Sequence, residues 1–255
     1  MTRRLRKAII NNAPTLQYEK ALWASGKEIL VGIDEVGKGA WAGPLTIGAV
    51  VIPPDKRLYK IRDSKLLNEQ ERELRFEPIV NWSLTWSIGE ATSEECDEFG
   101  MSIAQKIATK RAIEKLSLTP DHVLIDGNWD FAGEIVGKEN VTKIVKGDMK
   151  CLSIAAASIL AKVTRDRAMK TAGGRYPVYG FPENKGYPCQ RHRKALKEIG
   201  PCEIHRKSWN FQFSGVLGRK GALKPLEFLR NSLCFCVPAP RHRIPESGRS
   251  SWKST

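Results

Sequence analysis

The chain has 255 residues, of which 41% are hydrophobic and 27% charged, a composition that excludes a wholly disordered protein and allows a proper core. Its 42 basic and 28 acidic residues give a formal net charge of +14, which favours a polyanionic partner such as nucleic acid. The longest uncharged stretch, residues 39–54, is broken by glycine and proline and is shorter than the roughly 20 apolar residues of a membrane span. The basic start leads into no secretory segment and the six cysteines form no CxxC pair, so we expect a reduced, cytoplasmic protein without a membrane partner.

The first half of the chain alternates short apolar runs with amphipathic segments. Residues 1–27 are predicted to be a basic leader with a helix at 16–24. Runs rich in β-branched residues predict strands, and apolar residues at helical spacing predict helices. These signals place strands at 28–34, 45–52 and 83–89 and helices at 68–80 and 102–116.

The second half is more helical and ends in a segment of different composition. Its predicted elements are strands at 122–126 and 141–145 and helices at 152–169 and 190–199. From residue 214 onward the sequence is rich in glycine, proline, serine and basic residues, which indicates a flexible basic tail at 214–255.

The order of these elements predicts an α/β fold. Consecutive strands near the beginning favour antiparallel pairing, whereas strands that alternate with helices later favour parallel pairing. We therefore expect a mixed sheet covered by helices, in a domain that spans residues 28–213.

Four acidic residues stand where α/β proteins collect ligands. Asp34 and Glu35 close the first strand, Asp126 closes a later one and is followed by glycine, and Asp148 precedes the long helix. Four acids at one place would repel one another unless a cation neutralised them, and all-oxygen ligands favour Mg²⁺ or Mn²⁺. Two such ions about 4 Å apart could activate water and stabilise the leaving oxygen of a phosphodiester. Taken singly, each acid is more often an ordinary strand-end or helix-capping residue, so the hypothesis depends on the four together.

Five stretches in fixed order carry a resemblance to a known family. They are residues 32–44 (GIDEVGKGAWAGP), 63–66 (DSKL), 124–127 (LIDG), 146–166 (KGDMKCLSIAAASILAKVTRD), and 185–192 (KGYPCQRH) with 200–206 (GPCEIHR). Together they closely resemble ribonuclease HII, the type 2 ribonuclease H family. The resemblance covers residues 28–209.

This resemblance implies a ribonuclease H fold, a five-stranded mixed sheet flanked by helices with extra C-terminal helices. It implies an endonuclease that cuts the RNA strand of RNA–DNA hybrids and nicks duplex DNA 5′ of embedded ribonucleotides, leaving a 3′-hydroxyl and a 5′-phosphate. The family's metal-binding carboxylates, which hold Mn²⁺ or Mg²⁺, match Asp34, Glu35, Asp126 and Asp148.

The resemblance also assigns substrate contacts. Gly37, Lys38 and Gly39 match a loop that reads the ribose 2′-hydroxyl through its backbone, although arginine is usual where Lys38 stands. Tyr187 matches a tyrosine that stacks on the sugar after the ribonucleotide.

Four basic residues are candidate phosphate contacts, and for each a solvated surface position is an equal alternative: Lys65, Lys146, Lys162 and Arg165. Two cysteines depart from the family pattern. Cys151 stands where serine is common and Cys189 where a small hydroxyl residue is common, so we expect a modest loss of phosphate affinity.

Two other function classes remain open at this point. One is a hybrid-binding protein that has lost catalysis, and the other is a ribonuclease H-like nuclease of different specificity. The leading hypothesis is a monomeric enzyme of replication and ribonucleotide repair, with RNA–DNA hybrids and ribonucleotide-containing duplex DNA as partners.

Overall fold

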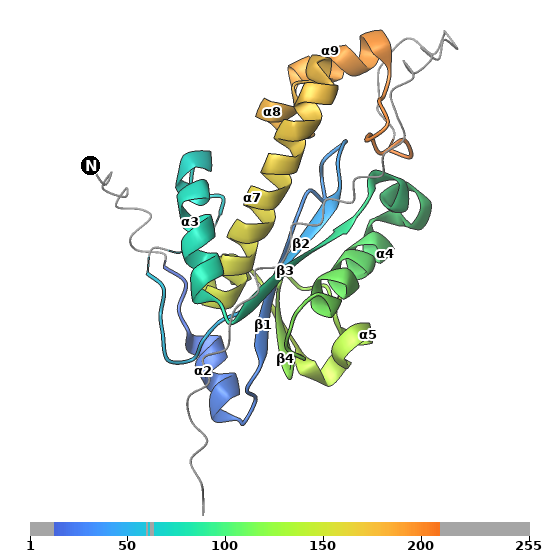
Figure 1. The fold of residues 1–255 in the computed structure, drawn as a ribbon. Coiled ribbons are helices and arrows are strands. Elements are labelled where there is room, and N and C mark those ends of the chain that lie inside the picture. Colours follow the sequence, from blue (N-terminus) through green and yellow to red (C-terminus); the bar gives the residue numbers. More distant parts are fainter. Residues whose placement is uncertain (1–12, 60, 62–63, 210–255) are drawn as a thin grey trace, which may run out of the picture. The chain divides into compact units, whose positions relative to one another are not determined.

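The computed structural model describes residues 13–59, 61 and 64–209 (Figure 1). Its strands are β1 (Leu30–Val36), β2 (Leu45–Val51), β3 (Thr85–Ala91), β4 (His122–Asp126) and β5 (Val141–Ile144). Its longer helices are α2 (Gln17–Ala24), α3 (Glu69–Trp82), α4 (Ser93–Glu114), α7 (Leu152–Arg175) and α9 (Gln190–Ile199). Short helical turns are α5 (Gly133–Val136), η1 (Lys138–Asn140), α6 (Gly147–Lys150), η2 (Pro177–Tyr179) and α8 (Phe181–Asn184).

The strands form one five-stranded mixed sheet in the order β3-β2-β1-β4-β5. β2 pairs antiparallel with both β1 and β3, whereas β4 pairs parallel with both β1 and β5. Antiparallel pairing of the early strands and parallel pairing of the later ones is the predicted arrangement, so the mixed α/β sheet is confirmed.

Helix boundaries differ from the sequence prediction mainly in α4. The sequence places its start at residue 102, but the helix begins at Ser93 behind a capping box formed by Thr92 and Glu95. Gly100, with φ +75°, interrupts the regular helical backbone, and this glycine separates the early turns from the periodic stretch that the sequence shows.

Helices cover both faces of the sheet (Figure 1). α7 and α3 lie on one face and share a core of side chains that includes Val50, Ile79 and Leu160. α4 lies on the other face over Ile33 and Ile47. β1 is therefore buried on both faces, as its apolar sequence requires.

α7 lies unusually close to β1 and β2 because two strand glycines leave room for it. A Cβ on Gly32 would lie 2.5 Å from the backbone nitrogen of Ile154, and one on Gly48 would lie 2.5 Å from the carbonyl oxygen of Ala157. The buried alanines at 155–157 contribute the matching small surface. This contact fixes the start of α7, and the short helix before it, beside the end of β1.

Residues 13–27 pack against the domain, unlike the separate leader that the sequence suggests. Glu19 of α2 is completely buried, and its Oε1 accepts hydrogen bonds from the backbone N–H of Ser153 at 2.9 Å and the thiol of Cys151 at 3.0 Å. The packed body thus begins before the predicted boundary at residue 28. The predicted tail at 214–255 and residues 1–12 lie outside the described residues.

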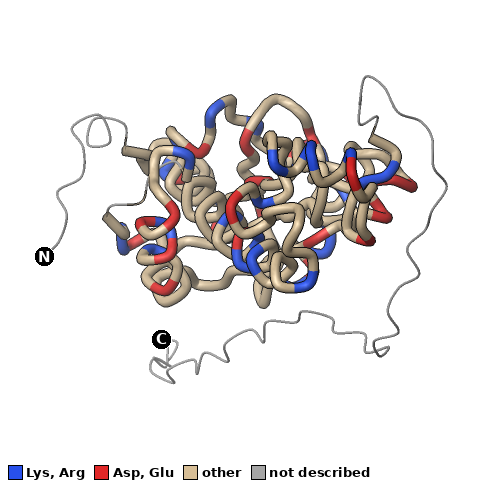
Figure 2. Tube along the Cα trace, turned by 90° about the horizontal axis from the view of Figure 1, so that it is seen from above, with Lys and Arg blue, Asp and Glu red and all other residues tan. Residues whose placement is uncertain are grey.

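Basic and acidic residues are interspersed over the described part of the chain (Figure 2). In the sequence, residues 1–12 hold four basic and no acidic residues, and residues 214–255 hold eight basic and two acidic ones. Most of the net positive charge therefore belongs to the two ends of the chain. None of the described helices combines the length and the apolarity needed to cross a bilayer.

Candidate active site

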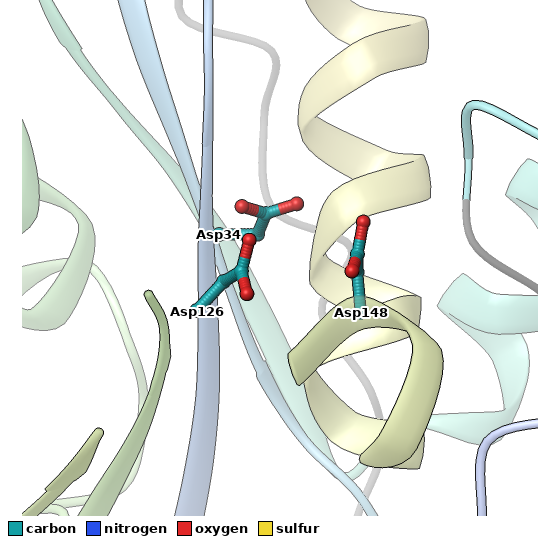
Figure 3. A group of neighbouring side chains, drawn as sticks. All are labelled: Asp34, Asp126 and Asp148. Atoms are coloured by element: carbon teal, nitrogen blue, oxygen red, sulfur yellow. The ribbon is translucent and has the colours of Figure 1, made fainter. Parts of the chain in front are cut away.

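Three aspartates converge at one end of the central strands (Figure 3). Asp34 comes from β1, Asp126 is the last residue of β4, and Asp148 lies in α6. One carboxylate oxygen of each lies within 4.8 Å of the other two. Asp34 and Asp148 are buried and Asp126 is half-buried, so most of the group is shielded from solvent.

The sheet register explains this convergence. β1 and β4 are parallel neighbours that pair up to Ile33 and Ile125, and the next residue in each strand is an aspartate of the group. Neighbouring parallel strands end at the same edge of a sheet, where α/β proteins bind ligands. The third aspartate comes from α6, where the backbone N–H of Gly147 donates to Oδ1 of Asp126 at 2.6 Å.

Glu35, the fourth predicted acid, points to the opposite face of the sheet. Side chains alternate along a strand, so Asp34 lies on the α7 side whereas Glu35 lies on the α4 side. There the side-chain amide of Gln105 donates to Glu35 Oε2 at 3.1 Å, and the Lys38 ammonium lies 3.8 Å from Oε1. The three aspartates thus form one group of oxygens, and Glu35 lies beside it on the other side of β1, close enough for its charge to raise the pKa of Asp34.

Gln105 is a site residue that sequence reasoning missed. Its side chain also accepts a hydrogen bond from the Lys38 ammonium at 3.4 Å. It therefore connects Glu35 with the glycine-rich loop at residues 37–44. The residue is only 1% exposed and lies on the face of α4 that carries the buried Ala104 and Ala108. The sequence did hold a signal for Gln105: it is a polar residue at a position where the helical repeat predicts an apolar one, and a buried polar side chain needs a partner.

Burial and mutual repulsion disfavour the ionised form of the aspartates when no cation is bound. Burial raises the pKa of Asp34 well above its usual range, and the surrounding carboxylates raise it further, against a hydrogen bond from Ser158. Burial is also the main cause of the raised pKa of Asp126 and of Glu35. A cluster of carboxylate oxygens without sulfur or imidazole fits a hard divalent cation such as Mg²⁺ or Mn²⁺.

A buried arginine holds the glycine-rich loop that follows β1. The guanidinium of Arg165, on α7, donates to the carbonyl oxygens of Ala42 at 3.0 Å, Pro44 at 2.9 Å and Lys185 at 2.8 Å. Arg165 is completely buried, so it cannot make the phosphate contact predicted for it. Its role is to fix the backbone on which the loop stands.

A second buried arginine, which follows α9 in the chain, holds the same loop. The guanidinium of Arg206 donates to the carbonyl oxygens of Lys38 at 2.9 Å and Gly43 at 3.2 Å. Gly37 has φ +91°, and a Cβ there would overlap the Arg165 side chain and lie 2.7 Å from the carbonyl oxygen of Pro44. Only glycine fits this position, because both its backbone angle and its surroundings exclude a side chain.

Tyr187 lies beside this loop on the segment between α8 and α9. The carbonyl oxygen of Gly186 accepts a hydrogen bond from the backbone N–H of Trp41 at 2.8 Å, which joins the two segments. The Tyr187 ring is half-buried, and its Cε1 lies 4.0 Å from the position of a Cβ on Gly39. The structure thus brings the predicted stacking residue next to the predicted sensing loop.

The other predicted basic contacts lie in different surroundings. The side chain of Lys65 is 75% exposed, and its ammonium lies 3.2 Å from Oδ2 of Asp148, whereas Lys146 is exposed at the start of α6. Lys162 is half-buried and forms an ion pair with Asp166. Lys65 and Lys146 therefore remain the best-placed candidates for phosphate contacts.

Neither departing cysteine is directed toward a phosphate. Cys151 is completely buried and its thiol donates to Glu19, so its prediction as a lost phosphate contact is wrong. Cys189 is the residue that precedes α9, and its sulfur accepts the backbone N–H of His192 at 3.5 Å. The Cys189 sulfur thus caps the start of α9, whereas the Cys151 thiol ties α2 to the residue before α7.

Two buried histidines meet beneath the Tyr187 segment. Nε2 of His192 lies 2.9 Å from Nε2 of His205, and both side chains are at most 1% exposed. Burial lowers the pKa of His192, and burial with the nearby His192 lowers the pKa of His205 to about 4. The neighbouring Cys202 thiol has a pKa raised to about 11 and stays neutral, so the whole cluster is uncharged at neutral pH.

This neutral pair predicts acid sensitivity of the fold. A histidine with a lower pKa in the folded state binds its proton more readily after unfolding, so stability falls as pH drops from about 6.5 towards 4. Between pH 7 and pH 5 we expect the free energy of unfolding of the unmodified protein to fall by about 2 kcal/mol more than that of His205→Gln. Urea unfolding at both pH values measures this difference, and parallel losses in the two proteins would contradict it.

Comparison with known proteins agrees with the resemblance seen in the sequence. The family model for Ribonuclease HII matches residues 31–212. The ribonuclease HII of Streptomyces avermitilis is 40% identical over 199 residues, which cover 78% of this chain and 84% of that protein.

Two solved structures share this fold over nearly their whole length. The crystal structure of the ribonuclease H2 from Pyrococcus horikoshii matches with a TM-score of 0.62 at 28% identity, covering 72% of this chain and 95% of that one. The ribonuclease HII in a PCNA complex from Archaeoglobus fulgidus matches with a TM-score of 0.62 at 27% identity, covering 73% and 98%. The resemblance carried by five short stretches thus extends over the sequence and the fold.

Proposed function

Given that this chain belongs to the ribonuclease HII family, and is thus an endonuclease that acts on the RNA strand of RNA–DNA hybrids, we propose that it also nicks duplex DNA beside single embedded ribonucleotides. The cut falls on the 5′ side of the ribonucleotide and leaves a 3′-hydroxyl and a 5′-phosphate. The observation that carries the proposal is the convergence of Asp34, Asp126 and Asp148 within 4.8 Å, at the end of the strand that leads into the glycine-rich loop.

The carboxylates are the proposed holders of two divalent cations, Mn²⁺ or Mg²⁺. When bound, such ions would supply an activated water and charge stabilisation for the leaving oxygen. Asp34, Asp126 and Asp148 offer oxygens to a shared site, and Glu35 is the proposed fourth acid. In support, Glu35 lies close enough to Asp126 for the charge of the latter to raise its pKa.

The loop at 37–39 is the proposed reader of the 2′-hydroxyl. That hydroxyl distinguishes a ribonucleotide from a deoxyribonucleotide, and backbone groups can approach it only where side chains are absent. Arg206 holds the carbonyl group of Lys38, and Arg165 holds the carbonyl groups of Ala42 and Pro44 just after the loop, whereas Lys38 and Gly39 are exposed and free to meet the substrate. Tyr187 is the proposed stacking partner of the next sugar, and Lys65 and Lys146 are proposed to contact phosphates.

A three-substrate comparison tests the proposed specificity. Purified protein is incubated with an all-DNA duplex, the same duplex with one ribonucleotide, and a full RNA–DNA hybrid, each with Mn²⁺ or Mg²⁺. We expect cutting of the second and third substrates, at the 5′ side of the ribonucleotide in the second, and none of the first. An intact one-ribonucleotide duplex beside a cut hybrid would overturn the nicking proposal while leaving the family activity in place.

Other outcomes of the comparison would favour the alternative functions. Tight binding of hybrid without product at any metal concentration would favour a binding protein. Cutting of the all-DNA duplex would favour a nuclease of different specificity.

Several further properties stay predictions from the sequence: a monomeric state, a cytoplasmic location, roles in replication and repair, and a separate tail at 214–255.

A further inference from the structure

The buried histidine pair beneath Tyr187 forms a chain of hydrogen bonds with one direction. The backbone N–H of Cys202 donates to Nδ1 of His205 at 2.9 Å. A nitrogen that accepts a hydrogen bond carries no proton, so neutral His205 carries its proton on Nε2. That proton points at Nε2 of His192, 2.9 Å away.

The second imidazole continues the chain to Tyr187. Because Nε2 of His192 accepts a proton from His205, neutral His192 carries its own proton on Nδ1. Nδ1 lies 3.0 Å from the carbonyl oxygen of Tyr187, to which it donates. Donors and acceptors alternate without conflict from the Cys202 amide to the Tyr187 carbonyl, so the neutral pair permits one set of tautomers.

The surroundings make this chain rigid. His192 packs edge-on against Phe181 and tilted against Trp41, and Tyr179 lies edge-on against His205. A buried polar atom that loses its hydrogen-bond partner destabilises the folded state, because no water can replace the partner among the aromatic rings. Each hydrogen bond of the chain is therefore held in place.

Tyr187 is the point at which this chain meets the substrate side. Its backbone N–H donates to the carbonyl oxygen of Asn184 at 2.9 Å, and its carbonyl accepts from His192, so both backbone polar groups are fixed. The Arg165 guanidinium lies 5.5 Å from the ring centroid. Moving the carbonyl would therefore displace the ring that lies beside Gly39.

We propose that His192 is a positioning residue for ribonucleotide recognition through the hydrogen bond from its Nδ1 to the Tyr187 carbonyl, and that His205 serves it by fixing the tautomer that donates this bond. The proposal rests on the role of Tyr187 in the proposed function. The imidazoles touch neither substrate nor metal; they hold the stacking ring at the angle and depth at which it meets a sugar.

Two substitutions of the same residue separate positioning from packing. In His192→Asn the side-chain amide can occupy the place of Nδ1 and keep the hydrogen bond to Tyr187, but it loses the contact with His205. In His192→Gln the amide can reach the place of Nε2 and keep the contact with His205, but it loses the bond to Tyr187. Both variants remove the same ring from the same cluster, so each serves as the packing control of the other.

The measurement is kcat and KM on the one-ribonucleotide duplex, with Tyr187→Ala as the reference for complete loss of stacking. We expect His192→Gln to lose roughly tenfold or more in kcat/KM and His192→Asn to stay within about threefold of the unmodified protein. We also expect His192→Gln to add no further loss to Tyr187→Ala, since the two changes act on one interaction. Equal losses in both His192 variants, losses that follow their melting temperatures, or additive losses in the double variant would overturn the proposal.

The same set distinguishes this inference from the proposed function. A normal Tyr187→Ala enzyme would remove the stacking role of Tyr187 and the positioning proposal with it. An impaired Tyr187→Ala enzyme beside an unimpaired His192→Gln enzyme would remove the positioning proposal alone.

A spectroscopic measurement applies even where a variant does not fold. Long-range ¹H–¹⁵N spectra of the unmodified protein at neutral pH report the protonated nitrogen of each imidazole. We expect His192 as the Nδ1–H tautomer and His205 as the Nε2–H tautomer. The reverse assignment, or a charged imidazole, would overturn the chain.

Discussion

Asp34→Asn is expected to abolish cleavage of RNA–DNA hybrids, with a loss of at least about a hundredfold to a thousandfold, as for removal of other preorganised charges at reacting centres. Asparagine keeps the shape of the side chain but removes the charge that would hold a cation, and Asp34 is the buried member of the cluster that lies on the central strand. Initial rates on a full hybrid in Mn²⁺ and in Mg²⁺ measure the effect. Cleavage at the unmodified rate would remove Asp34 from the active site.

Thermal unfolding supplies the control for that variant. Because burial and neighbouring acids raise the pKa of Asp34, its ionised form destabilises the fold at neutral pH. In a chelating buffer we therefore expect Asp34→Asn to melt at a higher temperature than the unmodified protein. Added Mn²⁺ should raise the melting temperature of the unmodified protein more than that of the variant. A lower melting temperature in chelator would show that lost structure, rather than lost charge, explains an inactive variant.

Gly37→Ala is expected to impair both the fold and the recognition of ribonucleotides. An alanine at φ +91° costs about 1–2 kcal/mol for the backbone alone, and its Cβ would displace the buried Arg165 side chain. We expect a loss of about 2–4 kcal/mol in the free energy of unfolding. Because Arg165 also holds the Pro44 carbonyl, we further expect the rate of nicking at a single ribonucleotide to fall by roughly tenfold or more.

Gly39→Ala is the matched control, since it changes the same residue type two positions along the same loop. The nearest atom to a Cβ on Gly39 is Cε1 of Tyr187 at 4.0 Å, which is an ordinary contact. This variant should therefore unfold within about 0.5 kcal/mol of the unmodified protein. If both alanine variants are equally stable, the loop is not held as tightly as the contacts of Arg165 indicate.

Local signals in the sequence account for much of the fold. Runs of β-branched residues predicted all five strands, and the strand at 122–126 and the helix at 190–199 have the predicted bounds. The short helices α5, α6 and α8 have four residues each, too few to show a helical repeat. Asp148 therefore reads as a residue before a helix, although it lies within one.

The site was only partly predictable, for reasons that concern side-chain direction. Asp34 and Asp126 follow paired residues of parallel strands, so their approach follows once the pairing is known. The sequence could not decide between strand alternation and a turn at the adjacent acids, and alternation sends Glu35 to Gln105. Arg165 was predicted as a phosphate contact because it is a basic residue on a helix next to the acids. Its burial depends on the Ala42 and Pro44 carbonyls, which lie more than a hundred residues away in sequence.

The contact between Glu19 and the start of α7 has a consequence for the order in which the molecule is assembled. Glu19 and Ser153 are 134 residues apart in the chain. A ribosome releases α2 long before it releases its binding partner, so this early helix must wait, undocked, until the central sheet and the first turn of α7 exist. This early segment thus docks only after all five strands have been made.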